Sequence, residues 1–154
     1  MTTHEGGCLC GAIRYRISGN GLMLNACHCT ECQRTSGGAF GMSLIVLRDA
    51  LELTKGTPKR FDKRYEDGRR HKVFNFCAEC SGRVWNEMPS IPQIYNVKPG
   101  TLDDANKWLE PVAHLWLQEK QPWVPVPEGV LRFDTQPEDY GSVLKAYAEW
   151  QARP

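Results

Sequence analysis

The sequence has no block of basic residues and no long apolar run, and both absences narrow the classes of function. Nineteen lysines and arginines stand against eighteen acidic residues, so the formal net charge is only +1. Nucleic acids and anionic membranes are bound by clustered positive charge, and a membrane-spanning helix needs about 20 consecutive apolar residues. The basic stretch at 59–72 also contains Asp62, Glu66 and Asp67, which favours a solvated hairpin. We therefore expect neither nucleic acid nor a membrane as a partner.

An export signal is also missing, which bears on how the cysteines are used. The opening segment MTTHEG has neither the basic nor the apolar part of a signal or transit peptide. The expected location is therefore the cytoplasm, where disulfides are rare. Seven cysteines are an odd number, which also disfavours a disulfide framework. Metal binding is the favoured interpretation, and disulfides or a redox C-x-x-C are the alternatives.

The cysteines fall in three clusters with the spacing of metal ligands: C-x-C at 8–10, C-x-C-x-x-C at 27–32 and C-x-x-C at 77–80. Four thiolates complete a tetrahedral zinc site, while three leave one position for water or a substrate. The first and last clusters are two clips far apart in sequence, and joining them would staple a small β domain. Spacing thus favours a division into four and three. The sequence leaves open that Cys8 and Cys10 join Cys27 and Cys29 instead, and that the metal is an iron–sulfur cluster.

The three-cysteine site has two interpretations. In the first, its fourth position exchanges, and the metal acts as a Lewis acid toward a thiol or an aldehyde oxygen. In the second, a histidine closes the site; the candidates are His4, His28, His71 and His114. His28 lies between Cys27 and Cys29, and on a strand its side chain would point away from the metal.

The remaining pattern predicts a mainly antiparallel β fold in a single domain over residues 1–154. Residues 12–17 alternate apolar and basic side chains, which is typical of a half-buried strand. A helical turn is expected at 31–36, capped by Thr30 and ended by Gly37, and another at 103–108. Apolar residues at helical spacing predict a C-terminal helix at about 138–151. Further strands are expected at 22–26, 39–46, 51–55, 58–65, 71–76, 83–85, 94–98 and 113–117.

Three segments, taken in order, carry a resemblance to a known family. They are GGCLCGAIRY at 6–15, CHCTECQRTSGGAF at 27–40 and FCAECSGRV at 76–84. These segments resemble the glutathione-dependent formaldehyde-activating enzyme family, in the superfamily that includes centromere protein V. The stretches PVAHLW at 111–116 and KQPW at 120–123 extend the resemblance to about residue 134.

The resemblance implies a tent-like zinc-binding β fold with two Zn²⁺ ions per chain. It also implies a carbon–sulfur lyase that joins formaldehyde and glutathione to give S-hydroxymethylglutathione, so a small thiol and an aldehyde are the expected partners. The catalytic zinc is then assigned to Cys27, Cys29 and Cys32. The structural zinc is assigned to Cys8, Cys10, Cys77 and Cys80. The competing hypothesis is a non-catalytic module that carries or senses a thiol, or that binds a protein partner through the C-terminal helix residues Tyr147 and Trp150.

Other candidate residues have weaker support in the sequence. The turn at 35–38 offers hydroxyls and amides to an oxyanion, but a plain turn is favoured. His28 is a candidate proton carrier, although a structural role is favoured. Arg14 and Arg34 are candidates for binding carboxylates, with solvated surface charge as the favoured alternative. Trp116 and Trp123 are candidates for lining a pocket, and core packing is the default.

Overall fold

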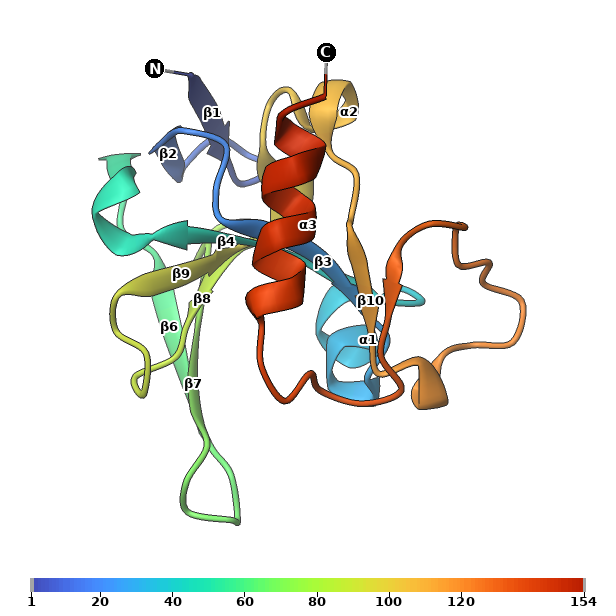
Figure 1. The fold of residues 1–154 in the computed structure, drawn as a ribbon. Helices are drawn as coiled ribbons and strands as arrows, with labels where there is room; N and C mark the ends of the chain where they lie inside the picture. Colours follow the sequence, from blue (N-terminus) through green and yellow to red (C-terminus); the bar gives the residue numbers. More distant parts are fainter. Residues whose placement is uncertain (1, 154) are drawn as a thin grey trace. The chain divides into compact units, whose positions relative to one another are not determined.

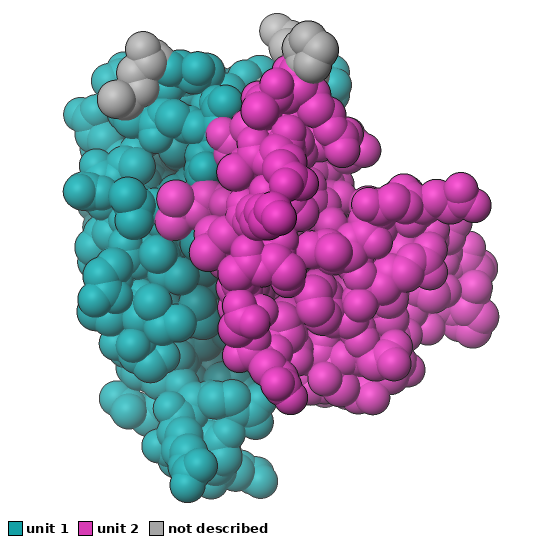
Figure 2. Space-filling model, in the orientation of Figure 1, with its two compact units in different colours: residues 1–21, 44–108 teal, residues 22–43, 109–154 magenta. Residues whose placement is uncertain are grey.

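The structure is a computed structural model that describes residues 2–153. Its chain, drawn as a ribbon in Figure 1, divides into two compact units, which Figure 2 shows in different colours. Unit 1 comprises residues 1–21 and 44–108, and unit 2 comprises residues 22–43 and 109–154. No helix among the described residues is long and apolar enough to cross a membrane. The prediction of a single domain stays a prediction.

Unit 1 contains a three-stranded antiparallel sheet in the order β1-β2-β5. Its strands are β1 (Thr3–Gly7), β2 (Arg14–Ser18) and β5 (Leu51–Lys55). The apolar side of the predicted 12–17 alternation is buried, and its members Ile13, Tyr15 and Ile17 are at most 2% exposed. Period-2 patterning therefore fixes which face of β2 contributes to the core.

Unit 1 also contains strands of the second sheet, which pair antiparallel in the order β4-β9-β8-β7-β6. β4 contributes through its residues 44–47. The β6–β7 hairpin is solvated as predicted: β6 is mostly exposed, and His71 pairs with Asp62 across it. The strands are β4 (Gly41–Leu47), β6 (Lys59–Arg64), β7 (His71–Phe76), β8 (Arg83–Glu87) and β9 (Ile94–Val97).

Unit 2 is built on the strand order β11-β10-β3, with β3 (Met23–Cys27), β10 (Ala113–Leu115) and β11 (Leu131–Arg132). β10 pairs in parallel with both neighbours, an exception to the mainly antiparallel arrangement that the sequence predicts. A long excursion of the chain separates β3 from β10, and parallel pairing requires such a connection. The mainly β class with a C-terminal helix is confirmed.

The C-terminal helix α3 (Gly141–Gln151) packs against β3 (Figure 1). Its buried residues are Val143 and Tyr147, so Tyr147 serves the core rather than a partner surface. Trp150 stacks on Tyr147 with ring centroids 5.3 Å apart. The helix starts three residues later than predicted, because the backbone of Tyr140 is its N-cap.

The remaining elements are short. α1 (Thr30–Ser36) and α2 (Ala105–Trp108) occupy the two predicted helical turns. Single 3-10 turns lie at Arg48–Ala50, Pro99–Thr101 and Leu117–Glu119. These turns, together with β1 and β11, are not predicted from the sequence, because they are too short or too glycine-rich to show a clear period.

Candidate metal centres

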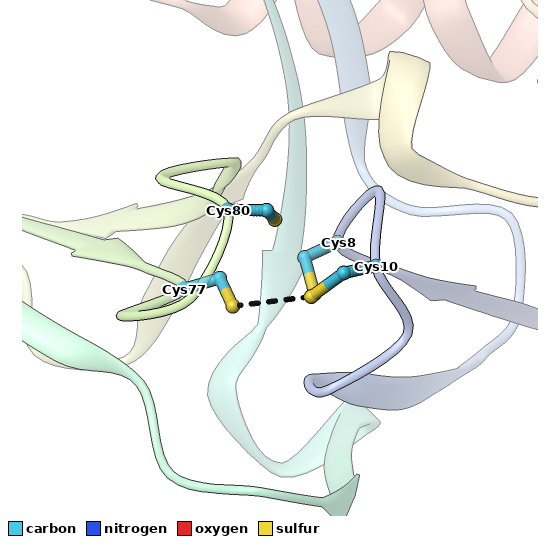
Figure 3. A group of neighbouring side chains, drawn as sticks. All are labelled: Cys8, Cys10, Cys77 and Cys80. Carbon is cyan, nitrogen blue, oxygen red and sulfur yellow. Dashed lines mark hydrogen bonds between the residues drawn. The ribbon is translucent and has the colours of Figure 1, made fainter.

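Two loops of unit 1 bring four cysteine sulfurs together (Figure 3). Cys8 and Cys10 follow β1, while Cys77 and Cys80 lie in the turn between β7 and β8. The Sγ of Cys10 lies 3.6 Å from that of Cys8 and 3.7 Å from that of Cys77. All four sulfurs lie within 4.8 Å of one another. This is the grouping that the spacing favoured over a joint site with the second cluster.

The distances between these sulfurs fit a tetrahedral zinc ion. Four Zn–S bonds of about 2.3 Å at tetrahedral angles separate the sulfurs by about 3.8 Å, close to the 3.6 and 3.7 Å found. A disulfide would require about 2.05 Å, and all seven cysteines are free. Four thiolates are also the soft donor set that Zn²⁺ accepts. The residues therefore fit the metal, while their structural role stays a prediction.

Main-chain amides face the sulfurs of this four-cysteine cluster. The N–H of Ile13 donates to Cys8 Sγ at 3.2 Å, and the N–H of Glu79 donates to Cys77 Sγ at 3.4 Å. Burial raises the pKa of the Cys8 thiol, but the Ile13 N–H and the neighbouring thiols together lower it to about 6. Amide donors thus stabilise the thiolate form, which is the form that binds metal.

The turn at 77–82 has its positive φ at a serine. Ser81 has φ 60°, whereas Gly82 is not in that region. A Cβ at Gly82 would make only ordinary contacts, 3.4 Å from Cys80 Sγ and 3.5 Å from Cys8 Cβ. The backbone strain of the turn therefore lies on Ser81.

A second cluster, in unit 2, contains the sulfurs of Cys27, Cys29 and Cys32, again within 4.8 Å of one another. Cys27 ends β3, and Cys29 is the N-cap of α1, where its Sγ accepts a hydrogen bond from the Cys32 N–H at 3.3 Å. The prediction that Thr30 is the cap is wrong. A thiolate at position 29 accepts a hydrogen bond from a free amide of the first helical turn and also faces the other two sulfurs. Gly37, with φ 65°, ends α1 as predicted.

The charges in this three-cysteine cluster are uneven. Hydrogen bonds from Cys27 and Cys32 hold the pKa of Cys29 well below its ordinary value. Side-chain hydrogen bonds with Cys29 and Cys32, together with burial, raise the pKa of Cys27. The thiolate form is therefore favoured most at the N-cap sulfur of Cys29.

No histidine closes the three-cysteine cluster among residues 2–153, and no carboxylate joins it there. His4 bonds Asp104 and Asn20, and His71 bonds Asp62. His28 is fully buried and contacts His114, which makes it structural rather than solvent-facing. The geometry thus favours the site with three protein sulfurs over the histidine-closed one.

The other candidates from the sequence are engaged elsewhere. The hydroxyls of Thr35 and Ser36 donate to main-chain carbonyls at 2.8 and 3.0 Å, and the amides of Gly37 and Gly38 bond within the same turn. These donors hold the turn, as the plain-turn interpretation expected.

Arginine and tryptophan candidates have mixed outcomes. Arg14 makes two hydrogen bonds to Asp103, so its charge is already paired, and Arg34 is exposed on α1. Trp123 is 73% exposed, so the default of core packing is wrong for it. Trp116 is half-buried and has φ 59°, a conformation that non-glycine residues rarely adopt.

Sequence reasoning missed three residues around the second cluster. Gln33 donates from Nε2 to the carbonyls of His28 at 2.7 Å and Glu119 at 3.0 Å, which ties α1 to the segment after β10. Gln136 and Tyr140 hydrogen-bond to each other. None of the three stood out in the sequence, because a glutamine carries no motif and Tyr140 matched the helical period.

Comparison with known proteins bears on both clusters. The model of the family "Glutathione-dependent formaldehyde-activating enzyme" matches residues 3–119, a span that contains all seven cysteines. A Halomonas elongata protein named "Putative glutathione-dependent formaldehyde-activating enzyme" is 29% identical over 159 residues, covering 97% of this chain and 94% of its own. A crystal structure of a Rhodobacter sphaeroides protein has a similar fold, with TM-score 0.51 and 19% identity over 64% of this chain and 87% of that one.

Proposed function

This chain belongs to the glutathione-dependent formaldehyde-activating enzyme family, and we propose on that premise that it joins a small thiol to an aldehyde. The proposed substrates are glutathione and formaldehyde, and the proposed product is S-hydroxymethylglutathione. The family match and the name of the Halomonas elongata relative support this choice. The reaction class is that of a carbon–sulfur lyase.

One observation carries the proposal: Cys27, Cys29 and Cys32 form a cluster to which the described residues add no fourth protein ligand. A Zn²⁺ bound there supplies a Lewis acid that accepts an incoming thiol and lowers its pKa. The cluster lies where β3 ends and α1 begins, so main-chain hydrogen bonds on both sides fix the three sulfurs. The same arrangement leaves the cluster half-buried rather than enclosed.

The chemistry balances without a redox partner. The thiol loses its proton, its sulfur bonds the carbonyl carbon, and the carbonyl oxygen takes up a proton to become a hydroxyl. The chain has to orient the thiolate and stabilise the oxygen as it becomes negative. A near-neutral surface is compatible with a small polar substrate and gives no steering toward a polyanion.

The four-cysteine cluster completes the proposal as the structural site. Cys8 and Cys10 on one side and Cys77 and Cys80 on the other clip two distant loops of unit 1. The proposed content is therefore two Zn²⁺ ions per chain, one in each cluster. We also propose that the whole chain acts as a single zinc-binding domain.

The test measures the rate at which free glutathione and formaldehyde exchange with S-hydroxymethylglutathione. The adduct also forms without an enzyme, so the rate is measured at equilibrium by NMR exchange spectroscopy. The zinc-loaded protein should raise this rate in proportion to its concentration, and Cys32→Ala should not. An unchanged exchange rate, with glutathione still altering the spectrum of cobalt-substituted protein, would support the non-catalytic module instead.

A further inference from the structure

A chain of three side chains in unit 2 connects Trp116 to Gln136 and Tyr140. The indole Nε1–H of Trp116 donates to Gln136 Oε1 at 3.0 Å, and Gln136 Nε2 donates to the Tyr140 hydroxyl. An indole N–H can only donate, so it fixes which end of the Gln136 amide faces it. The amide nitrogen must then face Tyr140.

This orientation determines what the phenol can do. Its oxygen accepts from Gln136, so the Tyr140 proton points elsewhere and remains available for a hydrogen bond. Burial raises the pKa of Tyr140 to about 12. Tyr140 is therefore a neutral donor at physiological pH. It is the N-cap of α3, the helix that packs against β3, and Cys27 is the last residue of β3.

The backbone explains how this donor is held near the cluster. β10 pairs in parallel with β3 so that Leu115 lies opposite Cys27, and Trp116 follows directly. The Trp116 N–H donates to the Thr135 carbonyl at 3.3 Å, which joins the segment preceding Tyr140 to the end of β10. Trp116 adopts its left-handed backbone here, and such strained residues concentrate at functional sites.

The segment before Tyr140 also borders open space. A hollow of about 420 Å³ is lined by residues 132–139 and Ser142, which include Gln136 but neither Tyr140 nor a cysteine. Gln136 and Tyr140 lie beyond residues 3–119, the span matched by the family model. The two residues that would present the phenol therefore belong to the C-terminal part of this chain, and only Trp116 lies within the matched span.

We propose that the Tyr140 hydroxyl, oriented by Gln136 and Trp116, donates a hydrogen bond to the aldehyde oxygen as the carbon–sulfur bond forms. This inference rests on the proposed function. The thiolate sulfur gives its electron pair to the carbonyl carbon, and the C=O π electrons move to the oxygen. Tyr140 keeps its own proton throughout, and the new alkoxide is protonated by water.

The first test compares Tyr140→Phe with Tyr95→Phe in zinc-loaded protein. Tyr95 is a half-buried tyrosine of unit 1 that stacks under Arg48, so its variant matches the loss of one phenol oxygen. Tyr140→Phe should lower kcat about 100-fold, as loss of one oxyanion donor does. Its glutathione affinity, measured on cobalt-substituted protein, should stay within about twofold. Trp116→Phe removes the hydrogen bond that orients the Gln136 amide. It should lower kcat by more than Tyr95→Phe does and by less than Tyr140→Phe does.

Two results would overturn the proposal. A Tyr140→Phe kcat within about twofold of wild type removes the donor role. If Tyr140→Phe loses as much glutathione affinity as it loses kcat/KM, then Tyr140 binds the thiol substrate and not the aldehyde oxygen.

The second test does not depend on turnover. Protein labelled with 3-fluorotyrosine gives a ¹⁹F resonance for position 140, assigned by its absence in Tyr140→Phe. This resonance should move when glutathione and formaldehyde are added together, and much less with glutathione alone. If wild type has no activity but the resonance moves, the proposed function fails and the contact stands. If the resonance is unchanged while cobalt spectra show bound thiol, the Tyr140 proposal fails alone.

Discussion

His28 Nε2 lies 2.8 Å from His114 Nδ1, although the two residues are 86 positions apart in the chain. The rings are stacked, with 25° between their planes, and both are buried. One nitrogen of the pair must donate and the other accept, so at least one ring is neutral. Burial lowers the pKa of both histidines, that of His114 to about 4, with help from His28 and Arg132. The pair therefore holds β3 and β10 together as an uncharged contact.

We predict that His114 makes the protein less stable in acid. Its folded pKa of about 4 lies below the ordinary 6.5, so below pH 6.5 the unfolded chain binds a proton that the folded chain excludes. The contribution is complete above pH 6.5 and declines toward pH 4, by about 2 kcal/mol at pH 5. Urea unfolding of wild type and His114→Asn from pH 7 to 5 should show the gap narrowing. Parallel curves, with metal content equal at each pH, would contradict this.

Gln33 should contribute more to stability than an exposed glutamine does. Its amide donates to two carbonyls, and its Oε1 accepts from Gln121 Nε2 at 3.1 Å. Gln33→Ala should lower the free energy of unfolding by about 1–3 kcal/mol. Gln33→Glu should be worse, because a carboxylate would face two carbonyl oxygens. Chemical denaturation checks both variants, and Gln93→Glu on the exposed surface is the control; equal effects of Gln33→Glu and Gln93→Glu would refute the assignment.

The four-cysteine cluster should be the one that holds the fold. Cys77→Ser should lose one zinc and lower Tm by more than about 10 °C, since a structural zinc contributes several kcal/mol to folding. Metal analysis and calorimetry measure both effects. Ala78→Ser, in the same turn, adds a hydroxyl without removing a sulfur and should change neither. A Cys77→Ser protein that lacks the metal yet melts like wild type would sink the structural role.

The three-cysteine cluster should tolerate the loss of its metal. Cys29→Ser keeps an oxygen at the N-cap of α1, so the helix should survive. This variant and Cys32→Ala should lose the second metal and the thiol-dependent activity, while Tm stays within a few degrees of wild type. Glutathione should perturb the spectrum of cobalt-substituted wild type and of neither variant. A histidine ligand on the metal, with no response to any thiol, would restore the closed-site interpretation.

At position 81, glycine should preserve the stability of the protein and valine should lower it. Its φ of 60° suits a residue without a branched side chain. Ser81→Val should lower the free energy of unfolding of zinc-loaded protein by about 1–3 kcal/mol, whereas Ser81→Gly should not lower it. Ser90→Val, at an exposed turn position without positive φ, is the matched control. Equal effects of the two valine substitutions would show that the backbone at position 81 carries no strain.

Much of the local structure was predictable because it depends on neighbours in sequence. Alternation identified β2 and its buried face, and glycine at position 37 marked the end of α1. Cysteine spacing identified both candidate clusters, since C-x-C and C-x-x-C bring sulfurs together within one turn. The cap of α1 was predicted one residue too late, at Thr30, because the role of Cys29 as N-cap depends on the thiolate cluster that it joins.

Long-range contacts explain what the sequence could not show. Parallel pairing of β10 with β3 depends on partners far apart in the chain. The bond between Trp116 and Gln136 likewise joins residues 20 positions apart, with no shared period. Tyr140 matched the apolar spacing of the C-terminal helix but became its N-cap, because the backbone reaches the helical conformation only at Gly141.

The different spans of the two clusters set an order for assembly. Cys29 and Cys32 are 3 positions apart, whereas Cys10 and Cys77 are 67 positions apart. Bringing distant positions together costs chain entropy that a short segment does not lose. As the chain leaves the ribosome, the short cluster can gather its sulfurs at once, while Cys8 and Cys10 must wait for the β7–β8 turn to be synthesised. If metal is scarce while the protein is synthesised, the thiols of Cys8 and Cys10 therefore stay unbound for longer than those of Cys27, Cys29 and Cys32. This N-terminal pair is then the one exposed to oxidation or to binding of the wrong ion.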